Sequence, residues 1–411
     1  MKVVQINATC GAGSTGKIAV ELSRAMTARG MENYILYSYE GTDYPLGIAN
    51  ASLPYIKLQA LKTRILGNYG FNSQYATKKL TQKLRKIQPD VVHLHNLGGH
   101  DCNFTMLFSY FRQQNIPVLW TFHDCLAFTG LCPYFGDCRR WKTLCEHCPK
   151  WREKSWFRDG STDLYLKKQQ AFRDLNLTIA APSRWMADLV QESFLRDYPV
   201  RVIPNGIDLQ VFTPRESDFR KKYQLEDAFL ILGVAFQWEE RKGLDVFLEL
   251  ARRLEPPFRL LLVGTDKKVD RLLPPQVISI HRTASQKELA EIYTAADLFL
   301  NPTREDNYPT VNMEAMACGT PVLTFRTGGS PESIGKNCGA VVETKDPAAV
   351  EAAIRRIREE RPFRKEDCLL RSRSFDSRCR TAEYIALYEE MAGSRSLPEK
   401  EKAYAQHPQG I

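Results

Sequence analysis

Short apolar runs alternate with helix-like patterns along most of the chain. Each run is three to seven residues long, which is typical of a buried strand, and each leads into a polar loop. Strands that alternate with helices predict an α/β fold with a parallel sheet. In the first half these runs are residues 3–6, 34–37, 91–94, 118–122 and 177–181.

A second series of the same kind starts after Asn205-Gly206, a strong turn signal. Two domains also suit a length of 411 residues. We therefore predict two domains, a last helix and a polar tail. Their ranges are 1–204 for the first domain, 205–375 for the second, 376–393 for the helix and 394–411 for the tail. Within the second domain the predicted strands are residues 229–235, 258–263, 277–281, 298–300 and 321–324.

The stretch from Asn301 to Glu332 carries two prominent acids. A strand ends at Asn301-Pro302, and a loop with Asp306 follows. Pro309 fits the first turn of a helix that contains Glu314 and stops at Gly319. A helix N-terminus attracts phosphate, and carboxylates beside it can accept hydrogen bonds from sugar hydroxyls. From spacing alone, ordinary surface acids are an equally good interpretation.

Two histidines follow matched strands in the first half. His95 comes after the run at 91–94, and His123 comes after the run at 118–122, with Asp124 next to it. Parallel sheets place function at the carboxyl ends of their strands. A lone histidine is more often a structural hydrogen-bonding group, but two at matched ends favour a functional role.

The first strand runs into a glycine-rich loop. Gly11, Gly16 and Lys17 have P-loop spacing, but that motif then needs Ser or Thr, and Ile18 stands there. We therefore interpret the segment as a loop that brings backbone N–H groups close to an anion. A P-loop and a plain tight turn are the alternatives.

The net charge of +9 allows nucleic acid, an anionic membrane or a phosphorylated substrate as partner. No zinc-finger or RNA-binding signature occurs, which disfavours nucleic acid. Basic residues interleave with apolar ones over residues 53–88, which fits either an anionic lipid surface or a solvated helix face. No run approaches the roughly 18 apolar residues of a membrane span, and the N-terminus lacks a signal-type apolar core, so we expect a cytoplasmic protein.

Five of the 11 cysteines lie between Cys125 and Cys148. One C-x-x-C pair with two further thiols is a candidate structural zinc site. Free thiols or a disulfide are the alternatives, although disulfides are rare in the cytosol. The candidate zinc ligands are Cys132, Cys138, Cys145 and Cys148.

Taken together, several short motifs resemble one family, in the order GSTGK (13–17), VVHLHN (91–96), WTFHD (120–124), APSRWM (181–186), PNGID (204–208), RKGLDVF (241–247), the 301–321 stretch and TGGSPE (327–332). This order resembles the family-4 glycosyltransferases of the GT-B fold, a retaining class that uses nucleotide-sugar donors. The cysteine-rich segment is similar to bacterial capsule and exopolysaccharide transferases of the colanic-acid type. The resemblance implies two Rossmann-like α/β domains facing across a cleft, with the last helix returning to the first domain.

The resemblance also implies roles for single residues. Glu314 would accept hydrogen bonds from the ribose of the donor. Asp306 stands where the family has a Glu beside the transferred sugar, and Glu305 could substitute for this shorter acid. Arg241 and Lys242 would hold the diphosphate, whose negative charge grows as the glycosidic bond breaks. The family's customary Gly-Arg is absent, and Phe236-Gln237-Trp238 stands instead.

The remaining residues implied by the family divide between donor and acceptor. His123 would lie beside the acceptor and the transferred sugar as a catalytic residue. His95 and Asp124 are expected on the acceptor side. Further donor-binding positions are Gly13, Gly16, Asn307, Tyr308, Pro309 and Thr310.

The expected activity is sugar transfer from a nucleotide-diphosphate sugar to a saccharide or lipid-linked saccharide in bacterial polysaccharide synthesis. We favour a same-face route, with no metal required for catalysis and zinc only as a structural candidate. The expected partners are the donor, the acceptor and the anionic inner face of the membrane. Nucleic acid is not expected as a partner. Two alternatives stay open: a nucleotide-sugar epimerase of GT-B fold, and a non-enzymatic degenerate sugar-nucleotide binding protein.

Overall fold

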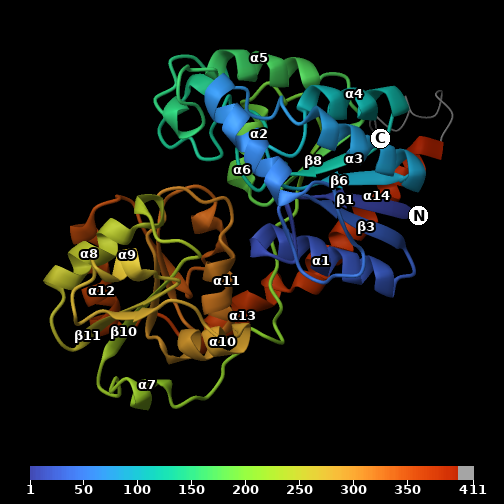
Figure 1. Cartoon of the computed structure of the whole chain (residues 1–411). Helices are drawn as coiled ribbons and strands as arrows, with labels where there is room; N and C mark the ends of the chain where they lie inside the picture. The colour runs from blue at the N-terminus through green and yellow to red at the C-terminus, as the bar shows by residue number, and fades with distance from the viewer. Residues whose placement is uncertain (397–411) are drawn as a thin grey trace, which may run out of the picture. The chain divides into compact units, whose positions relative to one another are not determined.

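The structure, a computed structural model, describes residues 1–396 and divides into two compact units (Figure 1). The first unit comprises Met1–Pro182, Met186–Ile203 and the described residues from Thr381 onward. The second comprises Ser183–Trp185 and Pro204–Arg380. Each unit contains one large parallel sheet with helices packed on it, which is the doubly wound α/β arrangement.

The first unit is built on a seven-stranded sheet in the order β5-β3-β1-β6-β7-β8-β9. The chain winds outward from β1 on one side and from β6 on the other, so these neighbours form the topological switch point. A separate two-stranded pair joins β2 (Thr9–Cys10) and β4 (Glu40–Gly41). The large sheet contains β1 (Lys2–Ile6), β3 (Glu32–Tyr37), β5 (Gly47–Ala49), β6 (Val91–Leu94), β7 (Val118–Thr121), β8 (Leu177–Ala181) and β9 (Val200–Val202).

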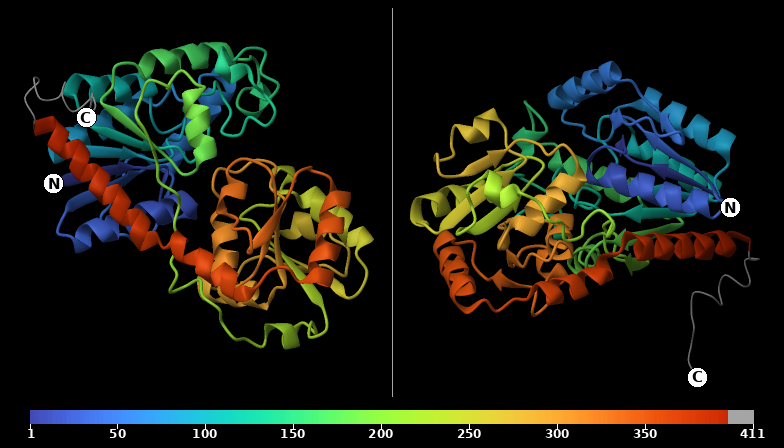
Figure 2. Two further views of the ribbon diagram at one scale, coloured as in Figure 1. Left: turned by 180° about the vertical axis from the view of Figure 1, so that it is seen from behind. Right: turned by 90° about the horizontal axis from the view of Figure 1, so that it is seen from below.

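Helices flank this sheet, and the last helix of the chain is one of them. Tyr384, Ile385 and Tyr388 of α14 (Ser377–Ser396) pack in one buried cluster with Val3 and Leu119 of the sheet. Figure 2 shows this helix lying along the first unit. The other helices are α1 (Gly13–Ala28), α2 (Leu53–Leu66), α3 (Gln74–Ile87), α4 (Phe104–Gln114), α5 (Ser161–Ala171) and α6 (Arg184–Gln191), with short 3-10 turns at Arg140–Lys142 and Trp151–Glu153.

The second unit has a six-stranded sheet in the order β12-β11-β10-β13-β14-β15. Its switch point lies between β10 and β13. The strands are β10 (Phe229–Val234), β11 (Phe258–Val263), β12 (Ile278–Ile280), β13 (Leu298–Asn301), β14 (Val322–Phe325) and β15 (Gly339–Val342). The helices are α7 (Phe219–Lys222), α8 (Leu244–Arg253), α9 (Lys267–Asp270), α10 (Gln286–Ala295), α11 (Thr310–Ala317), α12 (Pro347–Glu360) and α13 (Lys365–Ser372), with 3-10 turns at Glu240–Lys242, Ser330–Ser333 and Arg373–Phe375.

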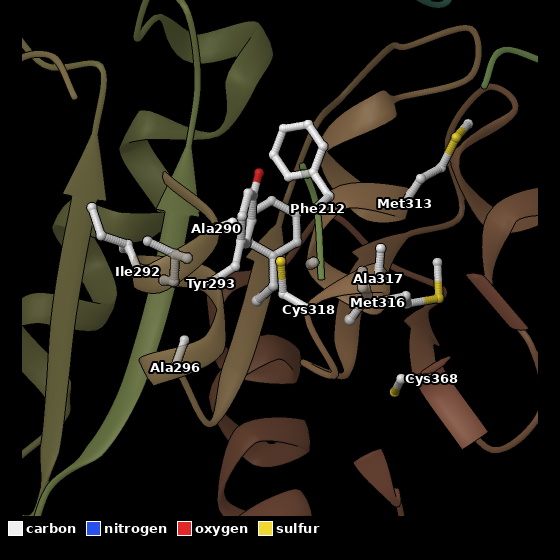
Figure 3. Packing of buried hydrophobic residues seen from close by; sticks show 14 of the residues in the cluster. Phe212, Ala290, Ile292, Tyr293, Ala296, Met313, Met316, Ala317, Cys318 and Cys368 are labelled. Carbon is white, nitrogen blue, oxygen red and sulfur yellow. The ribbon is translucent and has the colours of Figure 1, made fainter. Parts of the chain in front are cut away.

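Strand β13 shows how the second sheet separates two cores. Successive side chains of a strand point to opposite faces. Leu298 and Leu300 accordingly enter one buried cluster, together with Phe247 of α8. Phe299 enters the other, with Tyr293 of α10. Figure 3 shows part of this second cluster, where residues of α10 and α11 meet.

The fold class predicted from sequence is confirmed: both halves are Rossmann-like, and the last helix returns to the first unit. Two local expectations are wrong. The last helix continues to Ser396, three residues past its predicted end, and residues 397–411 of the predicted tail lie outside the described residues. Pro309 is the residue before α11 and has an extended backbone, so the helix starts at Thr310. Within the described residues, no helix is long and apolar enough to cross a membrane.

Candidate functional site

In the second unit, two loops meet at the carboxyl ends of β10 and β13. The loop after β10 ends in a 3-10 turn that carries Arg241 and Lys242, and Gly243 follows with a φ of 79°. A β-carbon at Gly243 would lie 2.5 Å from the carbonyl oxygen of Pro302, at the start of the loop after β13. Glycine is therefore needed where the two loops touch. This contact brings the predicted cations next to the predicted acids.

Lys242 and Asp306 form an ion pair, with Nζ and Oδ2 2.5 Å apart. Their side chains are 24% and 18% exposed, so the pair is partly shielded but open to a ligand. Arg241 donates from Nη1 to the carbonyl oxygen of Glu305 at 3.2 Å, and its Nη2 lies 2.8 Å from a carboxylate oxygen of Glu239. The site thus holds two cations and a partly exposed acid within one loop contact.

The loop that carries Asp306 is backed by Gly328 and Gly329. The Gly329 N–H donates to the carbonyl oxygen of Asp306 at 3.1 Å. A β-carbon at Gly328 would lie only 1.9 Å from that same oxygen, and Gly328 has a φ of 56°. The glycines of the TGGSPE motif are therefore explained by their packing against the acidic loop.

Glu314 is a half-buried residue of α11, and its Oε2 accepts a hydrogen bond from the Tyr293 hydroxyl at 3.1 Å. Tyr293 is fully buried, and burial raises its pKa well above the usual 10, so the hydroxyl stays protonated and keeps donating. The sequence pattern marks Tyr293 only as a core residue. The chemistry of its side chain could have identified it, because a buried tyrosine hydroxyl usually needs a hydrogen-bond partner.

The other predicted donor-side residues contribute in different ways. Tyr308 packs its ring into the core beside α11, so its side chain supports the loop. Glu305 and Asn307 are also buried, at 7% and 6% exposure. Thr310 begins α11 directly after Pro309, and no side chain caps this N-terminus. Its backbone N–H groups remain a site where an anion would be stabilised.

In the first unit, His95 and His123 contact each other directly. The Nδ1 of His95 lies 3.1 Å from the Nε2 of His123, and the Nε2 of His95 lies 2.9 Å from the Oε1 of Gln5. Gln5 donates its own amide N–H to the carbonyl oxygen of Ala19 at 2.9 Å. Since the Gln5 oxygen only accepts, His95 donates from Nε2 and accepts at Nδ1. His123 must then donate from Nε2, which leaves its Nδ1 as an acceptor.

Burial keeps these histidines neutral. It lowers the pKa of His123 to about 4 and lowers the pKa of His95 well below 6.5, with neighbouring His93 and His123 adding to the effect on His95. His93, behind them, contacts the Tyr388 hydroxyl through Nδ1 at 2.6 Å and the Thr121 hydroxyl through Nε2 at 2.8 Å. A neutral His123 can accept a proton or a hydrogen bond from a hydroxyl at Nδ1.

A pocket lies at the carboxyl ends of β6 and β7, with His95, His123 and Asp124 in its lining. Asp124 accepts from the Leu126 N–H at 2.9 Å, and burial raises its pKa.

Behind this loop the fully buried Lys168 donates to the carbonyl oxygens of Leu126, Thr129 and Gly130 at 2.7 to 3.2 Å. The sequence pattern gave no reason to single out Lys168, whose pKa burial lowers to about 7.

The glycine loop lies at the carboxyl end of β1, beside the switch point. Helix α1 begins at Gly13, and no side chain caps it. A β-carbon at Gly13 would meet no atom within 4 Å, whereas one at Gly16 would lie 2.6 Å from Thr9 Oγ1. A side chain at Gly13 would thus face open space, whereas Gly16 is explained by packing. Lys17 is already the fifth residue of the helix, which disfavours a P-loop.

Four cysteines surround a second pocket in the first unit. Its lining includes Cys132, Cys138, Cys145 and Cys148. A hydrogen bond with Cys132 lowers the pKa of the Cys148 thiol to about 7. In the described part of the chain, however, no three or more His, Cys, Asp or Glu side chains are arranged to hold a metal ion. The four thiols therefore line one pocket but are not arranged as the ligands of a metal ion. Structural zinc stays a prediction.

Comparison with protein families identifies the class of this protein. Residues 15–211 match the family described as Glycosyltransferase Family 4, and residues 227–360 match Glycosyl transferases group 1. The chain belongs to glycosyltransferase family 4. This glycosyltransferase is 24% identical to a protein of Escherichia coli K12 named for colanic acid biosynthesis, WcaC, over 84% of this chain and 88% of that protein. It is 31% identical to a D-inositol 3-phosphate glycosyltransferase of Geodermatophilus obscurus, over 48% of this chain and about half of that relative.

Solved structures place the glycosyltransferase in the GT-B fold. A sucrose-phosphate synthase from Thermosynechococcus elongatus aligns with a TM-score of 0.70 at 18% identity, covering 96% of this chain and 99% of that one. The Anabaena protein HepE, solved with UDP and glucose, aligns with a TM-score of 0.67 at 15% identity, covering 95% of this chain and 100% of that one.

Proposed function

We propose that this glycosyltransferase moves a sugar from a nucleotide-diphosphate sugar to a saccharide or lipid-linked saccharide in polysaccharide biosynthesis, with retention of the anomeric configuration. The observation that carries the proposal is the contact between Lys242 and Asp306 at the switch point of the second unit. It joins a cation suited to a diphosphate with an acid suited to sugar hydroxyls. HepE, solved with UDP and glucose, supports the donor class, and the relative named for colanic acid biosynthesis supports the kind of product.

In the proposed reaction, the bond between the anomeric carbon and the diphosphate oxygen breaks, and the nucleoside diphosphate leaves with the electron pair. Arg241 and Lys242 stabilise the charge that grows on that oxygen. The family's Gly-Arg is absent here, and Arg241, held by Glu239 and the Glu305 carbonyl, supplies a guanidinium instead. This arrangement assigns the leaving-group chemistry to two side chains of one turn.

Glu314 is proposed to bind the ribose of the donor. A carboxylate can accept hydrogen bonds from both ribose hydroxyls. The Tyr293 hydroxyl already donates to one oxygen of Glu314, which orients the carboxylate before the donor arrives. A group held in place in this way loses less entropy when the ligand binds.

For the stereochemistry we propose a same-face reaction. The acceptor hydroxyl attacks the anomeric carbon from the side of the leaving group, and a phosphate oxygen accepts its proton. The alternative, a covalent glycosyl intermediate, needs a carboxylate nucleophile. Asp124 is a poor candidate, because its side chain already caps the Leu126 N–H and burial raises its pKa.

Donor binding is tested by thermal shift with a panel of nucleotide sugars. A ligand that binds only the folded state raises the melting temperature. We expect one nucleotide class to raise it, and we expect Lys242→Met and Glu314→Gln each to abolish the shift. Lys222→Met, at an exposed lysine of the same unit, serves as the matched control. No shift with any nucleotide sugar would contradict the proposed donor class.

Turnover is tested by incubating the identified donor with and without candidate saccharide acceptors. We expect a new glycoside whose anomeric configuration, read by NMR, equals that of the donor. Donor epimerisation without acceptor would replace the proposal with an epimerase. An inverted product would overturn the proposed stereochemistry while leaving the transfer reaction intact.

A further inference from the structure

Helix α2 turns its apolar row towards solvent. Leu58, Leu61 and Ile65 are 49%, 46% and 44% exposed. Positions i, i+3 and i+7 share one face of a helix, and in an ordinary amphipathic helix this apolar face packs on the core. In α2 the buried positions are instead Ile56, Gln59 and Thr63, two of which are polar.

The polar inner face is held in place by specific contacts. The Thr63 hydroxyl accepts from Asn72 Nδ2 at 2.9 Å and lies 3.2 Å from Nδ1 of His100. These bonds fix the rotation of the helix about its axis. The outward leucines therefore result from a defined packing of α2, and the fold leaves a continuous apolar face exposed. Such faces mark interaction sites more often than scattered apolar residues do.

A second exposed apolar element lies at the C-terminal end of α2. Trp156 and Phe157 are 54% and 72% exposed. The Trp156 N–H donates to the carbonyl oxygen of Arg64 at 2.7 Å, and Nε of Arg158 donates to that of Leu66 at 2.9 Å. The aromatic pair is thus fastened next to the apolar row, and Figure 1 shows α2 beside the segment that carries it.

The surroundings of this face are strongly basic. Residues 44–89 contain eight Lys and Arg and no Asp or Glu. Lys57 and Lys62 are exposed on α2 beside the leucines. In the aromatic segment, Arg152, Lys154 and Arg158 outnumber Glu153 and Asp159. Apolar and aromatic side chains ringed by cations match the interfacial zone of an anionic lipid membrane.

We propose that these elements form a docking surface for an anionic lipid bilayer. We call it the α2 patch, and it consists of Leu58, Leu61, Ile65, Leu66, Trp156 and Phe157 with the flanking Lys57 and Lys62. The inference deepens the proposed function, since it rests on a lipid-linked acceptor being reached at the membrane. The apolar side chains insert between headgroups while the lysines contact lipid phosphates.

Charge decides between a bilayer and a second copy of the chain. A two-fold interface brings the same patch of each copy face to face. The lysines of one copy would then lie close to those of the other, and like charges across an interface are unfavourable. An anionic lipid surface meets the same cations with opposite charge. The bilayer is therefore the occupant that the patch fits.

The test uses the full chain and vesicles of phosphatidylcholine with and without 30% phosphatidylglycerol. We expect sedimentation with the anionic vesicles at low salt and little with neutral ones. Lys57→Gln/Lys62→Gln should weaken binding about thirtyfold, and salt should reduce this difference. Leu61→Gln/Ile65→Gln and Trp156→Ser/Phe157→Ser should each weaken it at least tenfold.

Matched controls separate the α2 patch from general surface effects. Leu370→Ser and Lys268→Gln change an exposed leucine and an exposed lysine of the second unit, and we expect normal vesicle binding. Binding that survives all three patch variants would overturn the proposal, as would a dimer that Leu61→Gln/Ile65→Gln dissociates. Nucleotide-sugar thermal shifts on the same variants in solution should equal wild type, so a failed donor assay is distinguishable from a failed docking surface.

Discussion

At the scale of single residues, the orientation of His123 depends on hydrogen bonds that start at Gln5. Replacing Gln5 by Leu removes the acceptor for His95 Nε2, which lies 2.9 Å from it. In wild type we expect His123 protonated at Nε2 and unprotonated at Nδ1 near neutral pH, as read from imidazole nitrogen NMR shifts. In Gln5→Leu we expect a mixture of tautomers, because nothing then fixes His95.

The matched control is Gln114→Leu, the same change at an exposed position of α4. Its His123 signals should stay as in wild type. If Gln5→Leu left the tautomer of His123 unchanged, the hydrogen bonds through His95 would not be what orients it. We further expect kcat to fall about 10- to 100-fold in Gln5→Leu with a smaller change in KM, because a misoriented His123 no longer holds the reacting groups in position.

Sequence reasoning could place His95 and His123 at matched strand ends but could not reveal their contact. That contact depends on how the strands pair: Gln5 of β1 lies opposite His93 of β6, and Leu94 lies opposite Trp120 of β7. These pairings join segments about 90 and 30 residues apart, and no local pattern encodes them. Gln5 was therefore missed, since a polar residue inside an apolar strand carries no signal of its partner.

At the scale of structural elements, the loop with Asp306 depends on the glycines behind it. Gly328→Ala would place a β-carbon 1.9 Å from the Asp306 carbonyl oxygen at a backbone angle that favours glycine. We expect a loss of about 2–4 kcal/mol in the free energy of unfolding, from backbone strain and overpacking. We also expect a loss of donor binding, since the loop must move. Urea denaturation and thermal shift with donor measure the two effects.

Gly393→Ala provides the control, because a β-carbon there would meet no atom within 4 Å. Alanine also has the higher helix propensity, so this variant should be as stable as wild type or slightly more stable. Full donor binding by Gly328→Ala would contradict the view that this glycine holds the acidic loop.

The cysteine-rich segment carries the predicted zinc site. If Cys132, Cys138, Cys145 and Cys148 bind structural zinc, the purified chain should contain about one zinc per molecule by elemental analysis. Cys145→Ser and Cys148→Ser should lose the metal and lower the melting temperature, whereas the exposed Cys379→Ser should retain both. Metal-free protein with four thiols reactive towards a thiol reagent would contradict zinc binding.

The amphipathic pattern of α2 predicts a helix but does not determine which of its faces packs inward. The apolar and basic positions of residues 53–88 predicted helix correctly, and the structure has two, α2 and α3. The pattern could not tell which face packs inward. That choice is made by partners outside the helix, namely Asn72 and His100, which hold Thr63 inside. The aromatic pair at 156–157 is about 90 residues away and joins the face only in three dimensions.

At the scale of the whole molecule, the two units differ in the titratable groups that they bury. Burial lowers the pKa of four histidines of the first unit and raises the pKa of two carboxyls there. The histidines are His93, His95, His100 and His123, and the carboxyls are Asp101, whose pKa reaches about 7, and Asp124. Within the described residues of the second unit, hydrogen bonds lower the pKa of the carboxyls of Asp266, Asp270, Glu343 and Asp376.

This difference predicts that mild acid destabilises the first unit selectively. Between pH 6.5 and about 4 the unfolded chain binds protons on histidines that stay neutral in the folded state, so the free energy of unfolding falls as pH falls. The two raised carboxyls act in the opposite direction, because the folded state holds their protons. Four histidines outnumber two carboxyls, so the free energy of unfolding falls on balance as the pH falls, by on the order of 1 kcal/mol per pH unit for each uncompensated histidine.

Calorimetry from pH 7.5 to 5.0, with hydrogen exchange to assign each transition, measures this effect. We expect the transition that includes α14 and the first sheet to move to lower temperature, while that of the second unit moves little. His93→Gln should lower stability at pH 7.5 but reduce the slope of stability with pH, since one buried neutral imidazole is removed. Equal shifts of both transitions would show that the buried histidines do not control the acid response.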